Sequence, residues 1–309
     1  MATLLDLKAR IKAVANIKKI TRAMQLVAAA KFTRAQNRAR ASRPYTKELD
    51  DILGVLATLT EMLSEEERTG RTIDFSFKEN EEPLRASWSK LLEQKEETKP
   101  GLVLITADRG LCGAFNTRLL RAAHQFIDEH EGKDYKLLLI GKKGYTYFRT
   151  KKHPIIYHRH GISDKLNLDE IKEVARNLVE LFINDEVDAL HLIYTRFKSA
   201  MISHVTQEKF LSIPPVKEKE TAGADLYILE PDRDVVFQRL FPLYATTKIF
   251  SALAESFASE YGSRMTAMQL ATKNAEEMLD SLIIERNRLR QAIITKELAE
   301  IVGGAEALK

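Results

Sequence analysis

Two short loops carry the glycines and basic residues that a phosphate group would need. One reads ADRGLCGAFN from Ala107 to Asn116, and the other reads GKKG from Gly141 to Gly144. Each follows a predicted strand and precedes a predicted helix, where free backbone N–H groups attract anions. Neither has the spacing of a Walker loop or of a dinucleotide fingerprint. Tight turns explain these glycines equally well, with Asn116 as a helix N-cap, and we favour that interpretation over a nucleotide site.

The other reactive side chains form no catalytic or metal-binding pattern. Cys112 is the single cysteine, so it cannot form an internal disulfide. A thiolate beside Arg109 would be activated, but no histidine lies within ten residues of Cys112, and a small buried cysteine is the simpler interpretation. The seven histidines lack metal-ligand spacing. We therefore predict no catalytic residue, no metal site and no cofactor.

The composition is that of an ordinary globular chain. It is 44% hydrophobic and 30% charged over 309 residues. No apolar run approaches the roughly 18–20 residues needed to span a bilayer. The first residues show neither the apolar core of a secretory signal nor a transit-peptide pattern. We therefore expect neither a secreted disulfide scaffold nor an integral membrane protein.

Glycine and proline are almost absent from both ends of the chain. Residues 1–53 contain only Pro44, and residues 243–302 contain only Gly262. At 1.5 Å per residue, helices of this length would measure roughly 80 and 90 Å, too long for the core of one domain. Because one helix enters the middle region and the other leaves it, we expect a long antiparallel coiled coil. The predicted seams comprise Leu4, Leu7, Ile11, Val14, Ile17, Ile20, Met24 and Val27, and Phe250, Leu253, Phe257, Tyr261, Met265, Met268, Thr272, Ala275, Leu279 and Leu282.

The middle of the chain alternates strands and helices, as in a doubly wound, Rossmann-like α/β domain. Strands are expected at 102–106, 137–140, 155–157, 189–195, 204–213 and 226–230, and helices at 116–130, 142–149 and 168–184. The acidic stretch before this domain is expected to be a solvated linker or surface insertion. The chain thus divides into an N-terminal helix (1–59), an acidic linker (60–99), a central α/β domain (100–231) and a C-terminal helix (232–309).

The first 43 residues are strongly basic. They contain eleven Lys and Arg residues against the single Asp6, a net charge of +10, whereas the whole chain carries +4. Such a segment suggests an acidic partner. Only Phe32 is aromatic here, so the interleaved rings that stack on nucleic-acid bases are missing. On charge alone a solvated helix face, an acidic protein partner and a nucleic acid all stay open, and a basic coiled coil that binds nucleic acid is the alternative function.

Three stretches of sequence together point to a family. They are KITRAMQLVAAAK at 19–31, DRGLCG at 108–113, and a C-terminal tract that reads SEYGSRMTAM at 259–268 and RQAIITKELAEIVGGA at 290–305. In content and order they closely resemble the gamma subunit of F-type ATP synthases. The resemblance covers both ends and the middle of the chain.

This resemblance implies a subunit that is not catalytic by itself and serves as the central-stalk rotor shaft of the proton-translocating ATP synthase. The shaft would couple ion-driven rotation of the membrane ring to conformational changes of the catalytic beta subunits. The implied partners are the alpha and beta subunits, the epsilon subunit and the membrane c-ring, with no nucleic acid. The implied location is the cytoplasmic face of the bacterial inner membrane, peripheral to it.

The resemblance also implies roles for individual residues. Arg290 and Gln291 would hydrogen-bond to beta-subunit loops, and Thr295 and Glu297 would support coupling. Met24 would lie where the shaft passes a beta-subunit lever, although a methionine at helical spacing also fits plain packing. A basic track facing acidic loops would comprise Lys8, Lys12, Lys19 and Arg22. An apolar tip turning in a sleeve would comprise Ile293, Ile294, Leu298, Ile301 and Val302. A foot facing epsilon and the ring would comprise Tyr227, Leu229 and Glu230.

Overall fold

The computed structural model describes residues 3–61, 72–79, 81–92, 96–199, 202–213, 230 and 232–307. The chain forms two compact units. The first unit combines Met1–Ala30 with Arg264–Lys309, and the second unit is Lys31–Ser263. Two long helices, α1 (Leu4–Glu61) and α7 (Arg233–Ala307), contribute to both units. The prediction of a long helix at each end of the chain is therefore confirmed.

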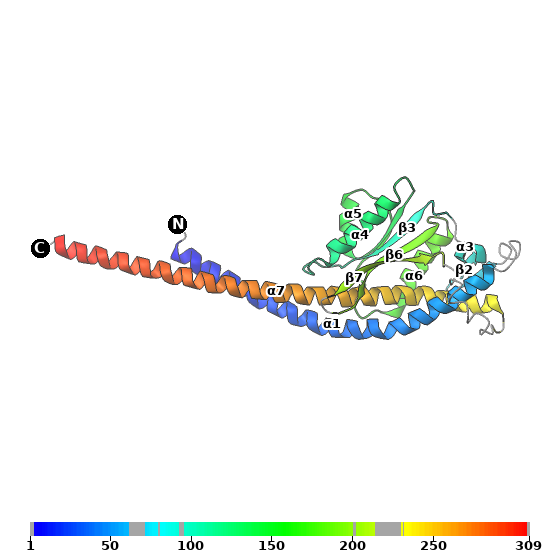
Figure 1. Cartoon of the computed structure of the whole chain (residues 1–309), viewed down its shortest axis with the longest axis horizontal. Coiled ribbons are helices and arrows are strands. Elements are labelled where there is room, and N and C mark those ends of the chain that lie inside the picture. Colours follow the sequence, from blue (N-terminus) through cyan, green and yellow to red (C-terminus); the bar gives the residue numbers. More distant parts are fainter. Residues whose placement is uncertain are drawn as a thin grey trace. The chain divides into compact units, whose positions relative to one another are not determined.

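The second unit is built on a five-stranded sheet in the order β5-β4-β3-β6-β7. The strands are β3 (Pro100–Ile105), β4 (Lys136–Ile140), β5 (Ile155–Arg159), β6 (Ala189–Phe197) and β7 (Ser203–Leu211). All are parallel except β7, which runs antiparallel to β6. Helices α4 (Phe115–Glu129), α5 (Lys142–Thr150) and α6 (Leu168–Ile183) connect them (Figure 1). The predicted doubly wound domain is confirmed, whereas the predicted strand at 226–230 lies, apart from Glu230, outside the described residues.

Alternation along the strands divides the core of this unit into two apolar clusters. Leu102 and Leu104 belong to one cluster, which includes buried residues of α4 and α5. Val103 and Ile105 belong to the other, which includes buried residues of α1, α6 and α7. Successive side chains of a strand point to opposite faces of the sheet. A strand covered on both faces is therefore a continuous apolar run, and β3 is buried at every position.

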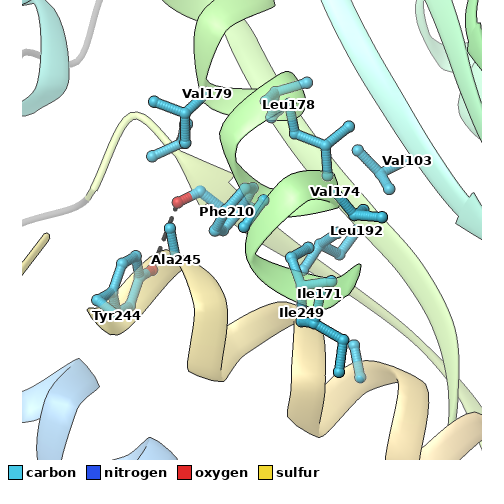
Figure 2. Packing of buried hydrophobic residues seen from close by; sticks show 14 of the residues in the cluster. Val103, Ile171, Val174, Leu178, Val179, Leu192, Phe210, Tyr244, Ala245 and Ile249 are labelled. Carbon is cyan, nitrogen blue, oxygen red and sulfur yellow. Dashed lines mark hydrogen bonds between the residues drawn. The ribbon is translucent and has the colours of Figure 1, made fainter. Parts of the chain in front are cut away.

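Helix α6 joins the sheet to α7. The Asn167 side chain accepts a hydrogen bond from the N–H of Asp169 (3.0 Å) and caps the start of the helix. Its buried residues recur at helical spacing and comprise Ile171, Val174, Ala175, Leu178, Val179 and Phe182. Figure 2 shows side chains of α6 beside Val103 and Leu192 of the sheet and Ile249 of α7. One amphipathic helix thus packs against both elements.

In the first unit α1 and α7 pair in antiparallel orientation. The hydroxyl groups of Thr21 and Thr272 lie 2.9 Å apart, and Lys18 Nζ lies 2.7 Å from Glu276 Oε1. Lys18 precedes Thr21 by three residues on α1, whereas Glu276 follows Thr272 by four residues on α7. The two helices therefore run in opposite directions. The part of the α7 seam that lies in this unit is confirmed, because its residues are all buried or half-buried; they comprise Met265, Met268, Thr272, Ala275, Leu279 and Leu282.

The predicted seam on α1 is partly wrong. Ile17, Ile20 and Val27 are 51%, 60% and 57% exposed. The buried and half-buried row instead steps by three and four residues, as in a heptad repeat. This row comprises Leu4, Leu7, Ile11, Val14, Lys18, Thr21, Gln25 and Ala28. Lys18 and Thr21 face α7 because each forms a polar contact across the seam. A prediction based only on apolar residues does not include them.

Part of the acidic stretch at 60–99 belongs to the core, which corrects the prediction of a solvated linker. Strands β1 (Thr72–Phe75) and β2 (Leu84–Ser87) form a hairpin, followed by α3 (Trp88–Leu92). The hairpin alternates, so that Asp74 points outward between Ile73 and Phe75, which are buried. The Phe75 ring meets the ring of Phe241 edge-on, 4.9 Å between centroids. Sequence reasoning missed this short apolar face because many of the residues around it are charged.

We expect Phe75→Ala to destabilise the protein by about 3–5 kcal/mol, because it removes a fully buried ring and leaves a cavity beside Phe241. The measurement is urea unfolding of the full chain. Glu79→Ala, an exposed position in the same segment, is the control and should change the free energy of unfolding by less than about 0.5 kcal/mol. Equal effects of the two substitutions would show that the hairpin is not part of the core.

Candidate functional site

The second glycine loop is closed by side chains of the chain itself. The Asp108 carboxylate accepts a hydrogen bond from the N–H of Lys142 (2.8 Å), and the Thr106 hydroxyl accepts one from the N–H of Gly144 (2.9 Å). Gly141 has a φ of 103°, and a Cβ there would lie 2.0 Å from the Thr106 carbonyl oxygen. A carboxylate thus occupies the start of α5, where a phosphate would bind. This geometry favours the turn interpretation.

The first glycine loop is held by Asn116, which corrects its predicted role as an N-cap. The N-cap of α4 is Ala114, and Asn116 lies inside the helix. Its Oδ1 accepts a hydrogen bond from the N–H of Ala107 (3.0 Å), and its Nδ2 lies 3.2 Å from Cys112 Sγ. Cys112 is buried in the apolar cluster under α4, as predicted. A thiol in apolar surroundings is unreactive, so Cys112 packs this loop.

One cluster of titratable side chains lies just before β3. Glu97 lies 3.0 Å from Lys209 Nζ, 2.9 Å from His191 Nε2 and 3.7 Å from His130 Nε2. Burial raises the pKa of Glu97, but hydrogen bonds from His191 and Lys209 outweigh it and hold the pKa below its ordinary value. The lysine ammonium supplies the positive charge here. Across the described ranges of the chain, no three His, Cys, Asp or Glu side chains are grouped to hold a metal ion.

A cavity of about 520 Å³ lies in the second unit between α1, α7 and the β6–β7 pair. Four of its charged wall residues form two ion pairs: Arg43 lies 2.6 Å from Glu255, and Lys248 lies 2.9 Å from Asp50. These two pairs hold the elements around the cavity together. Sequence reasoning missed them, although Glu255 is the one charged residue in the stretch 252–258. A single charged residue among small and apolar residues of a helix is the signal that indicates a buried ion-pair partner.

The predicted basic track is exposed on α1 of the first unit. It comprises Lys8, Lys12, Lys19 and Arg22. Their spacing places them along one side of the helix, next to the row that faces α7. On the side of α1 that faces away from this row, Ile20 and Val27 are exposed, while Met24 beyond them is half-buried. The outer surface of α1 in this unit therefore combines a basic edge with an apolar face.

The last part of α7 exposes every described side chain from Arg290 to Val302. The polar candidates Gln291, Thr295 and Glu297 belong to this stretch, and the Thr295 hydroxyl donates to the Gln291 carbonyl oxygen (2.9 Å). The predicted apolar tip is exposed as well, and comprises Ile293, Ile294, Leu298, Ile301 and Val302. A helix with apolar residues on several sides requires burial against other surfaces. This segment is therefore the strongest candidate for a binding surface.

The predicted foot is described only in part. Glu230 is exposed, and Tyr227 and Leu229 lie outside the described residues. Among the residues that the structure describes, no helix combines the length and the apolar character needed to cross a bilayer.

Comparisons with known proteins agree along the whole chain. The ATP synthase family model matches residues 3–308. The ATP synthase gamma chain of Moorella thermoacetica is 41% identical over 309 residues, which cover 100% of both chains. A chain of the Euglena gracilis mitochondrial ATP synthase has the same fold at 17% identity, with a TM-score of 0.65, 99% of this chain and 94% of that chain covered. A chain from the central stalk and c-ring of the Tetrahymena thermophila mitochondrial ATP synthase aligns at 24% identity, with a TM-score of 0.56 and coverage of 82% and 99%.

The family model and the curated relative both span essentially the full chain, and the identity to that relative is far above the level at which only a fold is shared. The helix pair, the doubly wound domain and the exposed C-terminal segment occur together in this one chain. The chain belongs to the family of ATP synthase gamma chains.

Proposed function

We propose that this gamma chain is the rotor shaft in the central stalk of ATP synthase. In that role it couples ion-driven rotation of the membrane ring to conformational changes of the catalytic beta subunits. One observation carries the proposal: long antiparallel helices end in a segment whose described side chains from 290 to 302 are all exposed. Such a segment is suited to work inside other proteins. Nucleotide chemistry then belongs to the other subunits, and this chain transmits motion.

The proposed partners are the alpha and beta subunits around the helices, and the epsilon subunit and c-ring at the α/β domain. The similar Tetrahymena chain belongs to a structure described as central stalk and c-ring, and the Euglena chain to one described as OSCP, F1 and c-ring. The similarity to a bacterial gamma chain supports a peripheral location at the cytoplasmic face of the bacterial inner membrane. None of the comparisons favours the nucleic-acid alternative.

The basic track suits a surface that must slide past its partners. Exposed ion pairs contribute about 0–1 kcal/mol each, so no single contact would hold the shaft in one position. Together Lys8, Lys12, Lys19 and Arg22 would attract acidic loops of the surrounding subunits. A partner changes conformation only if the shaft binds one of its states better than the other. The asymmetric outer surface of α1, basic on one edge and apolar on the other, supplies such a difference.

The C-terminal candidates divide into polar and apolar roles. Arg290 and Gln291 would hydrogen-bond to beta-subunit loops, and Thr295 and Glu297 would support this coupling one turn or more farther along. The apolar tip around Ile294 and Leu298 would turn in an apolar sleeve; its members are Ile293, Ile294, Leu298, Ile301 and Val302. Non-directional apolar contact suits such a bearing, because it does not favour one angle strongly.

Two further contacts follow from the resemblance alone. Met24 would lie beside the beta-subunit lever, where its flexible thioether adapts to a moving surface. Tyr227, Leu229 and Glu230 would face the epsilon subunit and the ring.

A disulfide between α1 and α7 should leave a rotor shaft active. In the double variant Thr21→Cys, Thr272→Cys, the two sulfur atoms take the places of hydroxyl groups that lie 2.9 Å apart. The two cysteines are therefore close enough to form a disulfide. We expect unchanged ATP synthesis after oxidation, because both helices turn together. The reduced double variant is the control. Activity that disappears on oxidation and returns with reductant would show that the helices must move against each other.

Arg290→Ala with Gln291→Ala should leave assembly intact and lower ion-driven ATP synthesis by about tenfold or more, since a hydrogen bond to a charged group contributes about 1.5–3 kcal/mol. Synthesis is measured in membrane vesicles, and assembly from the subunit composition of the purified complex. Gln269→Ala with Lys273→Ala removes a similar exposed pair from the same helix and should have little effect. Wild-type synthesis by the first double variant would contradict the proposed contact.

A further inference from the structure

Three polar clusters in the second unit each join α1, α7 and the α/β domain. Every cluster contains one side chain from α1, one side chain from α7 and one group from the sheet or its loops. The first tie comprises Lys31, Tyr261 and Asp164, the second tie Arg43, Glu255 and Phe197, and the third tie Asp50, Lys248 and Glu208. At 1.5 Å per residue, Lys31 and Asp50 are roughly 28 Å apart along α1, so the ties are spread along the helix pair.

The first tie holds the loop between β5 and α6. The Asp164 carboxylate lies 2.9 Å from Lys31 Nζ and accepts a hydrogen bond from the Tyr261 hydroxyl (3.1 Å). Arg38 of α1 also donates to the Asp164 carbonyl oxygen. Burial raises the pKa of Asp164, but the bonds from Lys31 and Tyr261 outweigh it and leave the pKa below its ordinary value. The carboxylate therefore stays charged and bound to both helices.

The second tie holds the end of β6. The Glu255 side chain is only 3% exposed, and its carboxylate accepts hydrogen bonds from Arg43 (2.6 and 3.0 Å) and from the N–H of Phe197 (2.7 Å). Arg43 also donates to the Phe197 carbonyl oxygen. About one turn farther along α7, the Ser259 hydroxyl donates to the carbonyl oxygen of Thr195 (3.2 Å). Helix α7 thus binds the backbone of β6 where its pairing with β3 has ended.

The third tie lies at β7. Lys248 of α7 has a side chain only 9% exposed, and its Nζ lies 2.9 Å from Asp50 of α1 and 3.6 Å from Glu208 of β7. One buried ammonium group therefore holds carboxylates from two other elements. The second and third ties form the charged wall of the cavity between these elements.

Directional bonds resist motions that apolar packing permits. Hydrophobic burial is non-directional, so it holds elements together without setting their relative rotation. Charged hydrogen bonds require defined distances and angles. A displacement of either helix along its axis would leave the buried charges of Glu255 and Lys248 unpaired, which is strongly unfavourable. The ties therefore oppose both sliding and twisting of the α/β domain against the helices.

We propose that the three ties are the joint through which torque passes between the α/β domain and the helix pair. This inference rests on the proposed rotor function. Rotation driven at the α/β domain reaches α1 and α7 through side chains that bind all three elements, at three points along the helices. The tie residues act by positioning these elements and take no part in the chemistry.

The test uses assembled ATP synthase carrying Glu255→Gln in membrane vesicles. Glutamine keeps the size of the side chain and can still accept the Phe197 N–H bond, but it loses the charge that binds Arg43. ATP hydrolysis and ATP-driven ion pumping are measured on the same sample. We expect hydrolysis to persist and the number of ions pumped per ATP to fall several-fold. A variant that only assembled poorly would lower both rates together, so an unchanged ratio would overturn the proposal.

Asp74→Asn is the matched control. It breaks a bidentate pair with Arg85 (2.6 and 2.9 Å) in the same unit, but that pair joins only the two strands of the β1–β2 hairpin. The ions pumped per ATP should stay at the wild-type value. A fall equal to that of Glu255→Gln would overturn the proposal, because loss of any ion pair in the unit would then have the same effect.

Asp164→Asn weakens the first tie and replaces Glu255→Gln if complexes carrying the latter do not assemble; a wild-type ratio in Asp164→Asn would then overturn the proposal. The Arg290→Ala, Gln291→Ala double variant is measured alongside. If it lowers coupling while the tie variants do not, the torque joint is wrong and the rotor function stands. If none of these variants lowers coupling, the rotor function is contradicted as well.

Discussion

The hydroxyl groups of Thr21 and Thr272 meet in the seam between α1 and α7, where a coiled coil ordinarily places apolar residues. Along the same two helices, within the second unit, Arg43 and Glu255 form a bidentate ion pair. Polar groups of this kind accept few partners, so they specify register and orientation at some cost in stability. An apolar seam alone would tolerate a shift along the axis. The remaining contacts of both helices depend on this register.

The α/β domain has the strand order of a doubly wound sheet. The strand order reverses between β3 and β6, and in doubly wound sheets ligands bind beyond the carboxyl ends of the strands at that point. Here Asp108, just after β3, binds the start of α5, and Glu255 binds the end of β6. The Asp108 carboxylate thus takes a position at a helix start that a phosphate could use. The fold alone therefore does not establish the function, which has to be argued from the residues at this edge of the sheet.

Interaction strength differs between the inside and the outside of this chain. Glu255 is buried, so loss of its partner Arg43 would leave an unpaired charge inside the protein, which is strongly unfavourable. An exposed ion pair contributes only about 0–1 kcal/mol. Two of the groups that hold α1, α7 and the sheet together, Glu255 and Lys248, are buried charges of the first kind. The basic track and the exposed segment 290–302 offer contacts of the second kind or apolar surface. Repeated rotation within a complex requires a subunit whose own elements are held firmly together and whose outer surface binds its partners only weakly.

The sequence by itself determined the two long helices, the alternating α/β domain and, through the family motifs, the segment around Arg290 that is exposed. Scarcity of glycine and proline and local periodicity suffice for these, since both act over a few turns of chain. Only the tertiary structure decided that Thr21 faces α7 while Ile20 does not, that Phe75 reaches the core, and which charges form the ties. Helix α1 carries apolar residues on two sides, so periodicity alone cannot select the buried one. Contacts such as Thr21–Thr272 and Arg43–Glu255 join residues more than 200 positions apart, and their partners become known only when the chain is folded.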